Sequence, residues 1–209
     1  MLLAVLCTFM LFWAATRKRT MVPSRIQSVG ELMFEFVAGM VKENVGKEGM
    51  KYFPFVLTLF MFILFGNVLG LLPYSFTFTS HIVVNGALAM FIFVAVTVIG
   101  FARHGLRYLR LFCPEGTPLA VAIVLVPIEI MSYFIRPVSL SLRLFANMLA
   151  GHVLLKVLAG FIISLGIFGI VPFVAVSAVT LLEIMVAVIQ AYVFALLSTI
   201  YLNDAVHLH

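Results

Sequence analysis

Six ionisable side chains stand inside long apolar stretches of this chain. They are Glu129, Arg136, Arg143, His152, Lys156 and Glu183. A charge at the depth of a lipid bilayer costs on the order of several kcal/mol and marks a functional site by default. Glutamate and histidine can take up and release protons, whereas arginine keeps its charge at any working pH. These residue types therefore indicate proton transfer past a fixed positive charge.

Helical spacing sorts the polar residues into two stripes. The first stripe holds Glu129, Arg136, Arg143 and Asn147. The second stripe, on the last apolar stretch, holds Glu183, Gln190 and Tyr201. At about 100° per residue, each step of seven residues drifts by only about 20°, so the members of a stripe share one helix face. His152 lies about 180° from Arg143 and faces the opposite side. Proton-exchanging groups on separate faces, with a cation between them, suggest two half-paths and an electrostatic block.

Several of these residues also allow an ordinary structural interpretation. Arg136 could pair with Glu129 on its own helix, and His152 with Glu183 could be a buried structural pair. Lys156 could extend its ammonium group to the membrane surface, and Tyr201 could be an interfacial aromatic. Arg143 is the hardest to explain in this way, because no acid lies within four residues of it. Its counter-charge is expected on another helix or another subunit.

The composition places these residues in a membrane protein. Of the 209 residues, 64% are hydrophobic and 10% are charged, and the mean hydropathy is +1.22. A soluble domain is about half apolar and about a quarter charged. A soluble enzyme, a disordered chain and a nucleic-acid-binding domain are thus excluded. We expect an all-α polytopic protein with residues 1–209 in one membrane domain.

The apolar runs predict five membrane helices and one amphipathic surface helix. The membrane helices are expected at 1–16, 52–72, 82–102, 118–165 and 171–203, and the amphipathic helix at 24–46. The amphipathic helix could instead pack on a soluble partner. The 118–165 run would span about 72 Å as one helix, although an upright crossing needs only about 20 residues. It either crosses twice, with a break near Pro137, or is one long tilted helix. We favour two long, strongly tilted helices.

The basic residues set the expected orientation. Positive loops mark the cytoplasmic side of a membrane protein. Arg17 to Arg19 and Arg103 to Arg110 both follow apolar runs. They agree on an external N-terminus and a cytoplasmic C-terminus. The net charge of +5 is thereby explained by topology, and no nucleic-acid partner is expected.

Residues 139–152, which read SLSLRLFANMLAGH, resemble the signature of the a subunit of F-type ATP synthase. The resemblance extends to GNVLGLLP at 66–73, PEGTP at 114–118 and the stretch from Leu182 to Phe194, and it ends at Tyr201 and Leu202. His152 with Glu183 is similar to the mitochondrial and alphaproteobacterial pattern of that family. The resemblance implies a stator proton-channel subunit of an energy-coupling membrane, with a bacterial inner membrane favoured over the mitochondrial one.

The resemblance also implies roles and partners. Arg143 would face the ring of c subunits, with Gln190 close to it. Asn147, His152 and Glu183 would belong to the half-channel from the external side, and Glu129 to the half-channel toward the cytoplasm. Arg136 and Tyr201 are expected as supporting residues. The partners would be the c-ring, b-type peripheral stalk subunits, the rest of the complex and the lipid bilayer. The chain itself would be non-catalytic and would need no cofactor and no metal.

Two other classes of protein are disfavoured by the sequence. A secondary transporter would need paired repeats with broken helices at the midplane of the membrane, and no convincing repeat relates the two halves. An intramembrane hydrolase would need a nucleophile or metal motif, and neither G-x-S-x-G nor H-E-x-x-H occurs. A phosphate-binding G-x-x-x-x-G-K-[ST] loop is also absent from the sequence, so ATP chemistry is expected elsewhere.

Overall fold

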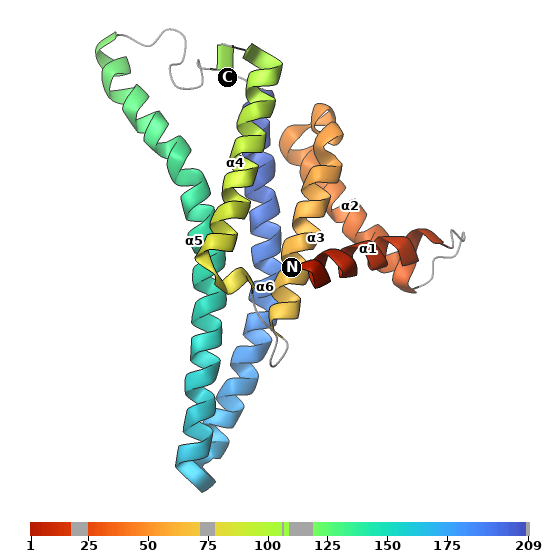
Figure 1. Ribbon diagram of the computed structural model, residues 1–209, viewed down its shortest axis with the longest axis vertical. Coiled ribbons are helices and arrows are strands. Elements are labelled where there is room, and N and C mark those ends of the chain that lie inside the picture. Colours follow the sequence, from red (N-terminus) through yellow and green to blue (C-terminus); the bar gives the residue numbers. More distant parts are fainter. Residues whose placement is uncertain (18–24, 72–77, 106, 109–118, 208–209) are drawn as a thin grey trace.

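Almost all of the part of the chain that the structure describes is helical (Figure 1). This computed structural model describes residues 1–17, 25–71, 78–105, 107–108 and 119–207. The elements are α1 (Leu2–Arg17), α2 (Arg25–Val45), η1 (Lys47–Tyr52), α3 (Phe53–Gly70), η2 (Phe78–Ser80), α4 (Ile82–His104), α5 (Leu119–Leu165), η4 (Gly166–Gly169) and α6 (Ile170–Val206). No strand occurs within those ranges, so the expected all-α fold is confirmed. The PEGTP motif and the end of GNVLGLLP lie outside the described residues.

Among the described residues, four helical stretches are long and apolar enough to cross a membrane. They are Lys47–Gly70, Ile82–His104, Ile123–Leu165 and Ile170–Val206. A shorter apolar helix, Leu2–Ala14, precedes them. By length and composition these helices are those of a polytopic membrane protein, as the sequence indicates.

The helix α6 is the central element of the bundle, because it contacts α2, α3, α4 and α5. Its small residues explain how four neighbours can approach it. Ala187, Ala191 and Ala195 recur every four residues and are completely buried. Small residues at this spacing let helix backbones pack closely in a membrane, where van der Waals contact is a main source of association.

The helix α5 is continuous over 47 residues, although Pro127 and Pro137 lie within it. A proline inside a helix removes one hydrogen bond and usually causes a kink, and membrane helices tolerate this where neighbours compensate. The structure therefore has a single helix here, with no break near Pro137. Figure 1 shows α5 and α6 running together past the ends of α3 and α4.

The amphipathic helix α2 places its apolar face against this same chain. Val37, Met40, Val41 and Val45 are buried, and α2 contacts α1, α3 and α6. Its other face exposes charged residues such as Glu31 and Lys42. Packing within the chain thus accounts for the buried stripe.

The bundle has two ends, which we name by exposed residues. At the Arg103 end, α3 begins while α4 and α6 finish, since Arg103 contacts Glu48 and His104 contacts Val206. At the His81 end, α3 finishes and α4 begins. The helix α5 runs antiparallel to α4, from the Arg103 end toward the His81 end. Its Tyr133 contacts Thr97 in the second half of α4, whereas its later residue Ser141 lies beside Gly86 near the start of α4.

Candidate functional site

His152 and Glu183 meet between α5 and α6. The distance from His152 Nδ1 to Glu183 Oε1 is 3.3 Å, and Glu183 is only 4% exposed. His152 Nε2 lies 3.1 Å from the carbonyl oxygen of Gly70 at the His81 end, and Nδ1 lies 2.9 Å from that of Met148. Both ring nitrogens therefore lie within hydrogen-bonding distance of a carbonyl oxygen. The arrangement can pass a proton between a histidine and a buried carboxylate.

Gly151 makes room for this pair. A Cβ atom built on Gly151 would overlap the carboxylate of Glu183. A residue with any side chain at this position would push the carboxylate away from α5. The glycine before His152 thus allows the close approach of the two helices at the site.

Asn67 is a buried polar residue that the sequence reasoning did not select. Its Nδ2 donates a hydrogen bond of 3.2 Å to the carbonyl oxygen of Ala187 on α6. Its Oδ1 is buried without a hydrogen-bond partner among the described residues. Asn67 lies one turn from Gly70 on α3, and Ala187 lies one turn from Glu183 on α6. We call His152, Glu183 and Asn67 the His152 cluster. The signal in the sequence was an amide within an apolar run of helical length.

Arg136 forms an ion pair across the bundle and not along its own helix. Its Nη1 lies 2.6 Å from Asp204 Oδ2 on α6. The interpretation that Arg136 pairs with Glu129 is therefore wrong. The guanidinium carbon also lies 5.3 Å from the ring centre of Tyr201 and 6.0 Å from that of Tyr133. Tyr201 thus contacts this cation, whether or not its ring lies at the membrane interface.

Tyr133 is itself fixed by two further hydroxyl groups. Its hydroxyl lies 2.6 Å from Thr97 Oγ1 on α4 and 3.1 Å from the Tyr108 hydroxyl. Burial raises the pKa of the Tyr108 hydroxyl above its ordinary value, so the group remains a hydrogen donor at physiological pH. We call Arg136, Asp204, Tyr133 and Tyr201 the Arg136 cluster. It lies at the Arg103 end of the bundle.

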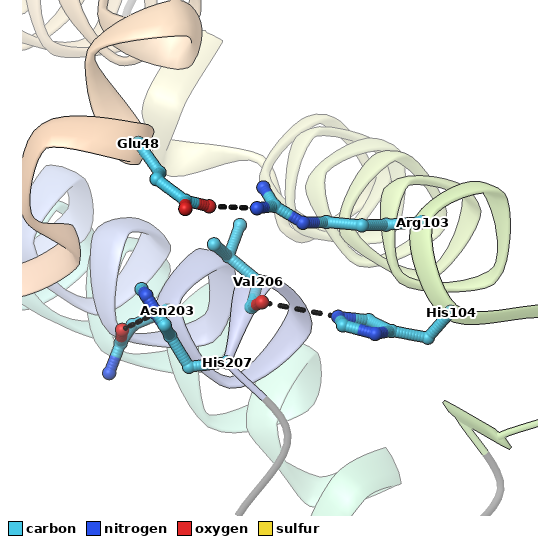
Figure 2. A network of polar contacts seen from close by, with 6 residues as sticks. All are labelled: Glu48, Arg103, His104, Asn203, Val206 and His207. Atoms are coloured by element: carbon cyan, nitrogen blue, oxygen red, sulfur yellow. Dashed lines mark hydrogen bonds and ion pairs between the residues drawn. The ribbon is translucent and has the colours of Figure 1, made fainter.

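The end of α6 is joined to the end of α4 by a contact that Figure 2 shows. His104 Nε2 lies 3.1 Å from the carbonyl oxygen of Val206, which is one of the last carbonyls of the helix. An orphan carbonyl at a helix end needs such a donor. Close by, Arg103 pairs with Glu48, and His207 Nδ1 lies 2.8 Å from Asn203 Oδ1.

Arg143 stands between the two clusters along α5. It follows Arg136 by seven residues and precedes His152 by nine, or about 10 Å and about 14 Å along the helix. Its side chain is exposed, and it makes no hydrogen bond or ion pair with the residues that the structure describes. The counter-charge is therefore not found in the described part of this chain.

The remaining predicted residues are distributed along the two long helices. Glu129 is half-buried on α5, two turns before Arg136. Asn147 is exposed one turn after Arg143, and Lys156 is exposed one turn after His152. Gln190 is 8% exposed on α6. Two clusters thus emerge, and five of the residues singled out from the sequence lie outside both: Glu129, Arg143, Asn147, Lys156 and Gln190. No set of three His, Cys, Asp or Glu side chains able to hold a metal ion occurs among the described residues.

Comparison with known proteins adds an independent finding. The protein family described as "ATP synthase A chain" matches residues 1–203. "ATP synthase subunit a" of Rhodospirillum rubrum is 60% identical over 210 residues, which cover 100% of this chain and 87% of the relative. The protein of the same name from Paramagnetospirillum magneticum is 55% identical over 217 residues, covering 100% and 88%. That from Allorhizobium ampelinum is 51% identical over 214 residues, covering 99% and 86%.

Proposed function

Since the chain belongs to the ATP synthase A chain family, whose members serve proton translocation in the membrane sector, we propose that it carries two offset proton half-channels separated by Arg143. The His152 cluster belongs to one half-channel, and Glu129 with the nearby Arg136 cluster belongs to the other. The chain performs no ATP chemistry. It works against a ring of c subunits and within a complex that includes peripheral stalk subunits of the b type.

The observation that carries this proposal is that the described part of the chain holds no counter-charge for Arg143. A cation held at membrane depth without a counter-charge is energetically costly. Arg143 has no acidic partner in the described chain, and its side chain is exposed. A carboxylate presented by a neighbouring c subunit would supply the missing charge. The exposed Ala146 and Ala150 on the same side of α5 would allow a partner helix to approach closely.

The positive-inside rule gives the two half-channels their sides. With a cytoplasmic C-terminus, the Arg103 end faces the cytoplasm and the His81 end faces outward. The His152 cluster then takes up protons from outside and passes them to a ring carboxylate. Once neutral, that carboxylate can turn through the lipid, because the cost of burying a charge has been removed. It later releases its proton toward Glu129.

Arg143 does two things in this cycle. It attracts the ionised ring carboxylate after proton release, and it repels a proton that would pass directly between the half-channels. An arginine suits this task because it does not give up its own proton. The driving force is about 2.3 kcal/mol per charge for each 100 mV of membrane potential.

Replacing Arg143 tests the proposal. Arg143→Ala should lower proton-driven ATP synthesis by at least about tenfold, because the ionised ring carboxylate loses the charge that balances it. The measurement is ATP synthesis in inverted membrane vesicles energised by respiration, with assembly checked by co-purification of the complex. Leu142→Ala is the matched control, since Leu142 is an exposed apolar neighbour on the same helix. Normal synthesis by an assembled Arg143→Ala complex would overturn the proposal.

A further inference from the structure

Arg136 shares a helix face with Glu129 but does not contact it. The two residues are seven positions apart, which is about 10 Å along α5 and only about 20° around it. Long side chains on a helix lean toward its N-terminus, and for Arg136 this is the direction of Glu129. An unrestrained Arg136 would therefore be drawn to the nearest carboxylate of its own stripe. The structure holds it elsewhere.

Groups from two helices surround the Arg136 guanidinium. Asp204 and Tyr201 are three residues apart on α6 and so lie on one face of that helix. Asp204 accepts from Nη1 at 2.6 Å, while the Tyr201 ring centre lies 5.3 Å from the guanidinium carbon. On α5, the ring of Tyr133 lies at 6.0 Å. An ion pair and two aromatic faces thus fix both the position and the plane of the cation.

The tyrosine on α5 cannot easily move aside. Its hydroxyl is bonded to Thr97 and lies close to the Tyr108 hydroxyl, and its ring packs on Phe93 with 4.8 Å between the ring centres. Tyr133 is itself 9% exposed. The side of the cluster next to α4 is therefore rigid, and the cation is directed toward α6.

Two carboxylates compete for this one cation. Glu129 makes no hydrogen bond or ion pair within the described residues. A carboxylate paired with a guanidinium keeps its charge and becomes a poor proton acceptor. Glu129 is therefore free to exchange protons only while no guanidinium pairs with it.

We propose that Asp204, Tyr201 and Tyr133 are positioning residues that keep Arg136 away from Glu129 and so leave the Glu129 carboxylate free to exchange protons. This inference rests on the proposed role of Glu129 in the cytoplasmic half-channel. It assigns Asp204 a function without making it a carrier of protons.

The test is a suppression experiment with the assembled ATP synthase in inverted vesicles. Asp204→Asn has nearly the same shape but releases Arg136, which then pairs with Glu129. ATP-driven proton pumping should fall by about tenfold, as expected when one partner of a partly buried ion pair is removed. Adding Arg136→Gln removes the interfering cation. The double variant should pump several times faster than Asp204→Asn alone.

Recovery in the double variant distinguishes the inference from a structural role. If the ion pair only stabilised the fold, or if Asp204 itself carried protons, the second substitution would leave pumping as low or lower. That result would overturn the inference, as would unchanged pumping in Asp204→Asn. Glu48→Gln is the matched control, because it breaks the other carboxylate–arginine pair at the same end of the bundle. It should pump like the unmodified complex.

The proposed function is tested separately in the same series. Glu129→Gln should abolish pumping whatever the state of Arg136. Unchanged pumping in Glu129→Gln would remove Glu129 from the half-channel, whereas failed suppression with an inactive Glu129→Gln would overturn only the positioning role of Asp204.

Discussion

At the scale of single residues, the contact between His152 and Glu183 requires that position 151 carries no side chain. The carboxylate of Glu183 occupies the volume that any side chain at position 151 would take. Gly151→Ala should displace the carboxylate from His152 and lower ATP-driven proton pumping by about tenfold, since a small displacement of a positioned group can cost a factor of this order or more. Pumping is measured by quenching of a pH-sensitive dye in inverted vesicles.

Gly160 provides the matched control for that substitution. It lies nine residues further along α5, and a Cβ atom added there meets nothing within 4 Å. Gly160→Ala should leave pumping unchanged. Equal rates in the two alanine variants would show that the space beside Glu183 is not critical.

The sequence pointed to most of the ionisable residues but not to all their partners. Arg136, His152 and Glu183 stand out in apolar stretches because charges are rare there. Asp204 did not, since we expected the last helix to span 171–203 and the helix instead continues to Val206. No glycine or proline marks that end. The partner of Arg136 therefore depends on how α5 and α6 align, which helical periodicity alone does not determine.

At the scale of elements, the contact between α3 and α6 includes a hydrogen bond from Asn67 to Ala187. Asn67→Ala should lower the thermal stability of the purified complex. The free-energy cost should be about 1 kcal/mol, because hydrogen bonds between membrane helices contribute about 0.6 kcal/mol on average and a small cavity adds to the loss. The measurement is the temperature at which this subunit is lost from the detergent-solubilised complex.

Thr58→Ala is the control on the same helix. The Thr58 hydroxyl is exposed, and within the described part of the chain it bonds only to carbonyls of its own turn, those of Pro54 and Phe55. It should leave the release temperature unchanged. A release temperature that stays the same in Asn67→Ala as well would mean that the hydrogen bond to Ala187 adds nothing to the α3–α6 contact.

The existence of the long helices could be read from the apolar runs, because few other structures bury so many consecutive apolar residues in lipid. Pro137 left open whether the 118–165 run was one helix or two. The structure has one, since the surrounding helices hold α5 on both sides of the proline. Which helices are neighbours in the bundle could not be predicted from the sequence. Nearly every face of these helices is apolar, so periodicity does not show which face is buried.

At the scale of the whole molecule, the arrangement predicts which surface is reached from which side. Single cysteines at His81 and His207 should be labelled by an impermeant maleimide from opposite sides, with Cys7 and Cys113 replaced beforehand. Both positions are exposed and lie at opposite ends of the bundle. The maleimide should label His81→Cys in intact cells and His207→Cys in inverted vesicles.

In permeabilised membranes the maleimide should label both variants, which controls for the reactivity of the two cysteines. The reversed pattern would invert the proposed orientation and exchange the sides of the two half-channels. Labelling of both cysteines from the same side would contradict the bundle itself, since its two ends are separated by the length of α4.

The ion pair between Arg136 and Asp204 also has a consequence for the order of events while the chain is synthesised. The two residues are 68 positions apart, and a ribosome that adds roughly 5 to 20 residues each second needs roughly 3 to 14 seconds to make that segment. During this interval α5 exists while its partner carboxylate has not been synthesised. Until then the only carboxylate on α5 within reach of Arg136 is Glu129, and Arg143 waits without a partner, at an insertion cost of roughly 3 kcal/mol for an unpaired arginine. The many leucine, isoleucine and valine residues of α5 are what let it enter the membrane first and find its counter-charge afterwards.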